Sequence, residues 1–260
     1  MKTDFDNAAT NYDQTFTNTV IGKLQRNLVY NNLSKILNEN NPKTILEINC
    51  GTGEDAIWLA KQSINVVATD ISSKMIEIAK DKSVLENLTF IQKDINQIVT
   101  EFSSKNFDLI FSNFGGLNCL SLSEMSAFFK NAAQILSTKG HLVLVIMPKS
   151  TLWEQCYFLI KLNLKNAFRR KKEYAIANVD GEKVITYYYN PKDIVNLAHT
   201  NFEVKTIKPI GFFIPPSYLE PFFKNKPKLI WVLNAFEKRI KNWSFLSKYA
   251  DHYFIVLQKR

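Results

Sequence analysis

The chain has 260 residues, 46% of them hydrophobic, and a formal net charge of +9. This length fits one large domain, and its longest apolar runs are strand-sized, which excludes a bilayer-spanning helix. Acidic residues near the N-terminus do not fit a signal peptide, and three widely spaced cysteines show no metal-ligand pattern. These features predict a cytoplasmic protein with reduced thiols and no metal site.

The N-terminal segment is polar apart from its aromatic residues, among them Tyr12. An apolar stripe follows at Val20, Leu24, Leu28 and 36–37, and its spacing predicts an amphipathic helix ahead of the first strand.

Residues 44–70 organise the chain. They predict a buried strand at 44–48, a glycine loop at 49–53, a helix from Glu54 to about Gln62, and a second strand at 66–69 that ends on Asp70. This is the first half of a nucleotide-binding βαβ unit. Gly51 and Gly53 allow the backbone to approach a ligand closely, and Asp70 is placed to accept hydrogen bonds from two ribose hydroxyls. We therefore expect a ligand that contains adenosine.

Acidic residues around the glycine loop indicate which adenosine compound fits. A dinucleotide would place its pyrophosphate at the start of the helix, where Glu54 and Asp55 would repel it. Glu47, just before the loop, adds a third carboxylate. Such a set suits a ligand with an ammonium and a sulfonium, such as S-adenosylmethionine. A nicotinamide enzyme is a weaker alternative, and acids in a first helical turn can also simply complement the helix dipole.

Further strands are predicted at 88–92, 107–112 and 141–147, with helices that begin after Ser72 and at Leu122. The loop of residues 113–118 follows the fourth strand. In open parallel sheets, ligands lie beyond the carboxyl ends of the strands, so this loop is expected to face both cofactor and acceptor.

The second half of the chain is strongly basic. Residues 1–150 contain 14 Lys/Arg and 15 Asp/Glu, whereas residues 151–260 contain 19 and 9, a net charge of +10. This asymmetry indicates an anionic partner (a phosphate, a carboxylate, nucleic acid or an anionic lipid surface) unless it is only a solvated surface. Trp153 to Phe168 predicts one basic amphipathic helix that packs on the core, covers an apolar substrate or makes peripheral contact with a membrane. Arg169 to Lys172 are expected to capture an anion.

The rest of the chain predicts a hairpin around Asp180-Gly181, a helix capped by Asn190, a sixth strand at 202–209, an aromatic insertion at 211–248 and a last strand at 253–258.

The run from Glu47 to Gly53, followed by Asp70 and Asp94, resembles the class I S-adenosylmethionine-dependent methyltransferases, and most closely the bacterial "methyltransferase domain type 11" group. The resemblance covers residues 5–150 well. It implies a doubly wound, Rossmann-like α/β sheet of seven strands, mostly parallel, with an antiparallel last strand. The chain would form a single domain, with a cofactor-binding core at about 40–150 and substrate-side elaborations at 150–190 and 211–248. Asn49 stands where the family usually has glycine.

The resemblance also assigns roles to residues. Tyr12 would be a lid over the cofactor, Ile71 and Met75 would flank the adenine, and Asp94 with Ile95 would bind its edge. The full cofactor set comprises Tyr12, Glu47, Asn49, Gly51, Gly53, Asp70, Ile71, Met75, Asp94, Ile95 and Asn113. The expected substrate side comprises Phe114, Asn118, Trp153 and Tyr157.

His252 is the candidate general base. In the resembled fold the antiparallel last strand starts on the active-site side, and histidine as a class accepts protons near neutral pH. The alternative is that His252 only caps the strand or packs beneath the 211–248 insertion. We expect methyl transfer to a small or lipid-like acceptor that is partly apolar, with an anionic group as an option. An RNA methyltransferase and a non-catalytic binding subunit are the alternatives, and the sequence indicates no oligomeric state.

Overall fold

The computed structural model describes residues 5–179 and 182–260. One sheet of seven strands has the order β3-β2-β1-β4-β5-β9-β8. Its strands are β1 (Thr44–Ile48), β2 (Asn65–Asp70), β3 (Leu88–Gln92), β4 (Phe107–Ser112), β5 (Leu136–Ile146), β8 (Phe202–Ile210) and β9 (His252–Lys259). β1 to β5 pair in parallel, and β9 runs antiparallel to both β5 and β8. The predicted methyltransferase-type sheet is confirmed.

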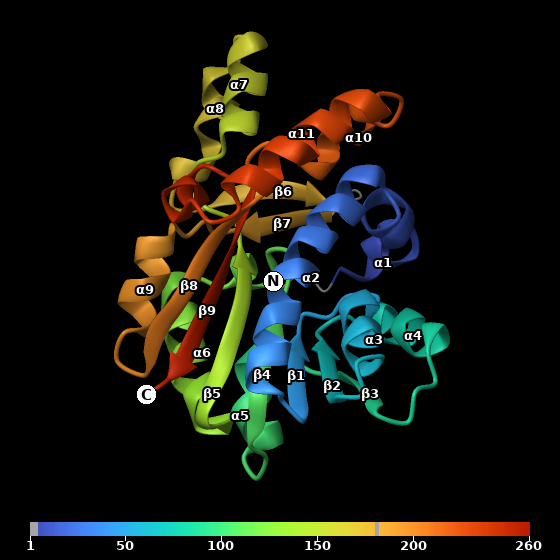
Figure 1. Ribbon diagram of the computed structural model, residues 1–260, viewed down its shortest axis with the longest axis vertical. Coiled ribbons are helices and arrows are strands. Elements are labelled where there is room, and N and C mark those ends of the chain that lie inside the picture. Colours follow the sequence, from blue (N-terminus) through green and yellow to red (C-terminus); the bar gives the residue numbers. More distant parts are fainter. Residues whose placement is uncertain (1–4, 180–181) are drawn as a thin grey trace.

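Helices cover both faces of the sheet (Figure 1). Apolar side chains of α2 (Val20–Asn40), α3 (Glu54–Ala60) and α4 (Ser73–Lys82) form one core with the sheet. Those of α5 (Ile98–Phe102), α6 (Leu122–Ile135) and α9 (Pro191–Ala198) form the other. Ser72 and Asn190 cap α4 and α9 as predicted. The glycine loop directly follows β1, so it lies at the carboxyl edge of the parallel strands, next to the point between β1 and β4 where the strand order reverses.

The second half forms a roof beyond that edge (Figure 1). It comprises α7 (Leu152–Ile160), α8 (Leu164–Ala167), η4 (Arg169–Lys171), the hairpin of β6 (Ala175–Val179) and β7 (Glu182–Thr186), η5 (Ser217–Leu219), α10 (Glu220–Phe223), α11 (Pro227–Ile240) and η6 (Ser244–Lys248). Two short elements, α1 (Asp6–Tyr12) and the π-helical η1 (Asp13–Thr17), precede α2, and η2 (Ile95–Gln97) and η3 (Gly116–Cys119) lie in loops. Among the described helices, none combines the length and apolar character needed to cross a bilayer.

Two predicted elements differ in the structure. The single helix expected from Trp153 to Phe168 is broken, because Leu162 adopts a left-handed φ of 55° between α7 and α8. The fifth strand begins at Leu136, directly after α6, and not at His141, since a register shift opposite Phe107 and Leu109 accommodates the extra residues. The turn expected at Asp180-Gly181 lies outside the described residues.

Candidate functional site

The glycine loop between β1 and α3 has three left-handed residues: Asn49, Gly51 and Gly53, with φ of 58°, 53° and 79°. Asparagine tolerates this conformation better than most residues with a side chain, so the loop keeps its shape without a third glycine. A Cβ at Gly53 would lie 2.8 Å from Ala79 and from the Phe90 ring, whereas one at Gly51 would meet only Tyr12, at 3.8 Å. Gly53 therefore allows helix–sheet packing, and Gly51 leaves open space beside the loop.

Asp70 ends β2 next to this loop and is buried. Its Oδ2 accepts a hydrogen bond from the Gly51 amide (2.8 Å), and its Oδ1 accepts one from the Ser72 amide (2.9 Å). Burial raises the pKa of Asp70, and these amide bonds partly offset that effect. The carboxylate is thus held in one orientation at the edge of the sheet.

Glu47 and Asp55 complete an acidic cluster with Asp70. Glu47 is buried on β1, and its Oε2 has no hydrogen-bond partner within the described residues. Burial raises the pKa of Glu47 well above its ordinary value, and the nearby charge of Asp55 adds to the shift. Asp55 accepts hydrogen bonds from Tyr30 (2.7 Å) and Asn113 (3.0 Å), while Glu54 is exposed.

Arg26 is the site residue that the sequence reasoning missed. It reaches from α2 to form a buried ion pair with Asp55, and its Nε has no partner within the described residues. Its guanidinium lies 5.9 Å from the ring centre of Phe16 and 5.3 Å from that of Phe114. In the sequence, Arg26 stands out only as an arginine within the apolar stripe of α2, and such a position does not by itself indicate a binding site. Three buried carboxylates around one arginine still leave an excess of acidic groups.

The N-terminal segment is tied down over the glycine loop. Asp13 accepts a hydrogen bond from Thr52 Oγ1 (2.7 Å) and pairs with Lys82. Asp6 accepts hydrogen bonds from Ser72 Oγ and from the Lys74 amide (3.3 Å). These contacts hold α1 and η1 against the first turn of α4 and the start of α3.

Tyr12 ends α1 in this segment and is half-buried, and desolvation raises its pKa to about 12. It lines a small cavity with Arg26, Gly51, Asp55 and Asn113. The cavity volume of about 30 Å³ holds roughly one water molecule, whereas small-molecule sites measure about 300–1,000 Å³. An adenosine derivative would fit into this cavity only if the N-terminal segment moved outward.

Four predicted cofactor residues lie around the carboxyl ends of β2 and β3. Met75 is buried in the first turn of α4, and its amide donates to the capping Ser72 hydroxyl (3.0 Å). Ile71 follows Asp70 and is half-buried. Asp94 caps η2 through the Asn96 amide (2.9 Å), and Ile95 opens that turn. The fold thus brings these residues to the same sheet edge as Asp70.

A row of rings leads from the lid toward the roof. Ring centres are 5.7 Å apart for Tyr12 and Phe16, 5.1 Å for Phe16 and Phe114, and 5.5 Å for Phe114 and His252. Phe114 has a φ of 43°, a conformation that is rare for a bulky residue and recurs at functional sites. His252 is the first residue of β9 itself, not a residue ahead of the strand, and it lies at the same edge as the glycine loop.

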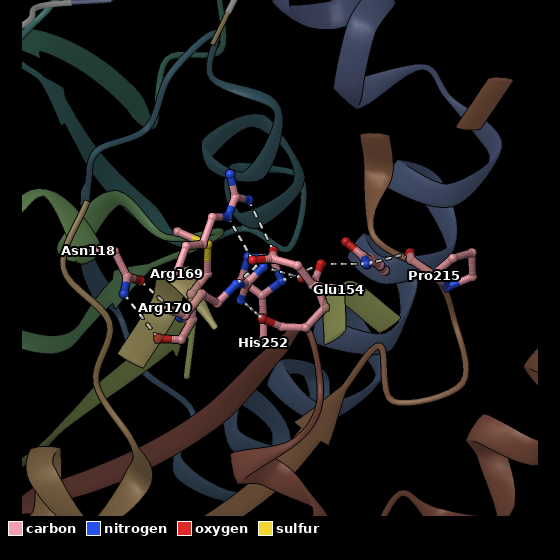
Figure 2. Close-up of polar contacts among 9 residues, drawn as sticks. Asn118, Glu154, Arg169, Arg170, Pro215 and His252 are labelled. Carbon is pink, nitrogen blue, oxygen red and sulfur yellow. Dashed lines mark hydrogen bonds and ion pairs between the residues drawn. The ribbon is translucent and has the colours of Figure 1, made fainter. Parts of the chain in front are cut away.

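Behind His252 lies a buried network of charges (Figure 2). Nδ1 of His252 lies 3.2 Å from Asp251 Oδ2, close enough for an ion pair when the ring is protonated. Arg170 reaches the other oxygen of Asp251 (3.2 Å) and also Glu154 (3.0 Å). Burial alone would raise the pKa of Asp251, but His252 and Arg170 hold it well below the ordinary value.

Two sequence-based expectations, for the arginines of this network and for Asn118, change with the structure. Arg170 is buried and Arg169 makes two hydrogen bonds to Glu154, of 2.7 and 3.1 Å, so neither guanidinium is held ready for an external anion. Asn118 is fully buried, and its amide bonds Met147 and Tyr187 backbone groups, as Figure 2 shows in part. The side chain of Asn118 therefore holds the loop in place through hydrogen bonds inside the protein.

Trp153 and Tyr157, predicted on the substrate side, lie in the roof. Trp153 packs edge-on against Phe223 (5.7 Å between ring centres), and Tyr157 packs against Tyr218 (6.0 Å). They connect α7 to the 211–248 insertion and do not line the cavity at the glycine loop.

The acidic cluster fits S-adenosylmethionine, because its orphaned Glu47 oxygen and excess carboxylates suit a ligand with an ammonium and a sulfonium. With S-adenosylmethionine bound there, Asp70 would hold the ribose, and Glu47 and Asp55 would face the end of the cofactor that carries the ammonium and the sulfonium.

Residues 45–140 match a family described as "Methyltransferase domain". The malonyl-[acyl-carrier protein] O-methyltransferase of Bacillus cereus is 29% identical over 73% of this chain and 64% of its own length. The demethylmenaquinone methyltransferase of Thermotoga maritima is 30% identical over 45% of this chain and 49% of its own length. The chain thus spans less than two thirds of these relatives. A crystal structure of an S-adenosylmethionine-dependent methyltransferase from Clostridium acetobutylicum superposes with a TM-score of 0.59 at 15% identity, over 91% of each chain.

Proposed function

We propose that this chain is a class I S-adenosylmethionine-dependent methyltransferase and that it transfers the cofactor's methyl group to a small or lipid-like acceptor with an apolar body. The observation that carries this proposal is the arrangement of the site. A buried acidic cluster lies beside Tyr12, and a row of rings runs from Phe16 through Phe114 to His252 at the same edge of the sheet.

We assign cofactor binding to residues 40–150 with the N-terminal lid, and acceptor binding to the roof segments 150–190 and 211–248. Tyr12, Glu47, Gly51, Asp70 and Asn113 would position the cofactor, which supplies an electrophilic methyl group. The protein would contribute alignment of the acceptor with that group, and water would be kept out by the closed lid. Since Glu154 already holds Arg169 and Arg170, the structure favours apolar contacts over an anion clamp on the acceptor side.

Binding and transfer can be tested separately. In titration calorimetry we expect S-adenosylmethionine and its demethylated product to bind in the micromolar range, and NAD not to bind, because carboxylates surround the loop. With radiolabelled cofactor, methyl counts should then enter the organic phase of a bacterial lipid extract and not purified tRNA. Tighter binding of NAD would contradict the proposed class. Label in tRNA alone would support RNA methylation, the runner-up function.

We also propose that His252 is the general base. The ring lies beside Phe114, and its Nδ1 is buried 3.2 Å from Asp251 Oδ2 but makes no hydrogen bond within the described residues, so the imidazole keeps a nitrogen able to accept a proton. His252→Ala is expected to lower kcat by about 10²–10⁴-fold and to change the pH–rate profile, with an unchanged Kd for the cofactor. His199→Ala is the control, since His199 is exposed at the end of α9. An unaltered profile would leave His252 only a packing role.

A further inference from the structure

Large exposed apolar side chains are concentrated in the roof. Among the described residues there are twenty such side chains, of which three lie in residues 1–150. Fourteen lie in two segments, 152–168 and 218–245: Leu152, Leu159, Ile160, Leu162, Leu164, Phe168, Tyr218, Phe222, Leu229, Trp231, Val232, Phe236, Trp243 and Phe245. We call residues 152–172 and 218–248 together the roof surface. Scattered exposed apolar residues are normal, but such a concentration marks an interaction site.

The most exposed members lie where the fold projects. Ile160 and Leu162, 83% and 90% exposed, form the turn between α7 and α8. Figure 1 shows this helical pair rising from the end of the molecule at which α10 and α11 also lie. Trp231 on α11 is 71% exposed and shares one exposed face of the helix with Pro227, Lys228 and Val232. This apolar surface therefore includes a convex projection.

The roof surface also accounts for the basic character of the second half. Residues 152–172 and 218–248 contain 13 Lys/Arg and 3 acidic residues, a net charge of +10. All three acids are engaged inside the molecule. Glu154 forms ion pairs with Arg169 and Arg170. Glu237 accepts hydrogen bonds from the backbone amides of residues 211–214, and Glu220 accepts hydrogen bonds from the amides of Val20 and Ile21. The remaining cations face outward without acidic neighbours from these segments.

Cations and apolar groups alternate on this surface. On α11, Lys228, Val232, Phe236 and Arg239 follow the spacing of one helix face, and the Arg239 guanidinium lies 5.6 Å from the Phe236 ring centre. Directly after α7, the ammonium of Lys161 lies 4.4 Å from the ring centre of Tyr157. Such a pattern is typical of surfaces that place apolar side chains at the depth of acyl chains and cations beside headgroup phosphates.

We propose that the roof surface docks on an anionic phospholipid membrane. Nucleic acid would neutralise the cations but leave Ile160 and Leu162 uncovered, and a protein partner would need a groove to receive their projecting turn. A bilayer satisfies both features. The roof lies above the acceptor side, so docking would bring a membrane-borne acceptor toward Phe114 and His252. The proposal goes beyond the proposed function, since membrane docking is measured without methyl transfer.

The test is flotation of the full chain with vesicles of phosphatidylglycerol and phosphatidylcholine in equal parts, compared with phosphatidylcholine alone. We expect binding only to the anionic vesicles, and weaker binding as salt rises from about 0.05 M to about 0.5 M. Ile160→Ser with Leu162→Ser, and separately Trp231→Ser, should each weaken vesicle binding by about tenfold or more. Val84→Ser is the matched control, because Val84 is 96% exposed but lies outside the roof surface.

Lys228→Glu with Lys238→Glu provides an independent second arm, in case an apolar variant fails to fold. These substitutions lower the net charge of the roof surface from +10 to +6 and should weaken the salt-sensitive part of binding. The proposal is overturned if anionic vesicles do not bind, or if Val84→Ser weakens binding as much as the roof variants. Binding to RNA or to an acidic carrier protein, with no binding to vesicles, would likewise overturn it.

Discussion

Replacement of Asp70 by alanine is expected to weaken S-adenosylmethionine binding by at least about a hundredfold. The side chain is buried at the carboxyl end of β2 and is fixed by the amides of Gly51 and Ser72. Two ribose hydroxyls would lose a charged acceptor, and each such hydrogen bond is worth about 1.5–3 kcal/mol. Titration calorimetry of the variant with the demethylated cofactor measures the effect.

Asp108→Ala is the matched control for this experiment. Asp108 also fixes backbone amides, those of Lys43 and Thr44, but it lies near the start of β4, at the opposite edge of the sheet. It should therefore cost stability without changing the cofactor Kd. If Asp70→Ala also left the Kd unchanged, Asp70 would be only a structural cap of the loop.

Glu154→Ala should lower the free energy of unfolding by about 3–5 kcal/mol, because removal of one partner leaves a buried charge uncompensated. Glu154 is 1% exposed and bonds both Arg169 and Arg170, and Arg170 itself is buried. For a chain of this size the melting temperature should fall by roughly 10 °C. Chemical denaturation of the variant and the parent protein gives the difference directly.

Lys149→Ala breaks a surface pair with Asp193 (2.8 Å) and should cost less than about 1 kcal/mol. A combined Glu154→Leu and Arg170→Met variant should recover part of the loss, since apolar replacements leave fewer charges buried. If Lys149→Ala and Glu154→Ala lowered the free energy of unfolding equally, burial would not decide the contribution of these ion pairs.

Asp251 adds a pH dependence to the stability. Because its pKa is lower in the folded than in the unfolded state, it stabilises the fold at neutral pH, and this contribution is lost progressively as the pH falls below about 4.

Local patterns predicted the cofactor half of the chain well. The strand, glycine loop and helix at residues 44–60 follow from short-range hydrophobic runs and turn residues, so their positions needed no tertiary information. Asn49 illustrates the limit, because its left-handed conformation explains the missing glycine only once φ is known.

Features that depend on distant contacts were not predictable. Helical spacing from 153 to 168 does not indicate that the chain turns at Leu162. The run of Arg169 and Arg170 predicts an anion-binding site, but in the structure Glu154 and Asp251 pair with these arginines. Arg26 was missed for the same reason, since its partner Asp55 is 29 positions away.

The ring row has a kinetic consequence. Phe16 belongs to the segment that covers the cofactor, whereas Phe114 lies between Phe16 and the acceptor side. An acceptor resting on Phe114 would hold Phe16 in place, and the cover could then not swing open. Turnover would accordingly follow a compulsory order: cofactor enters first, acceptor second, methylated product departs, and the spent cofactor leaves last.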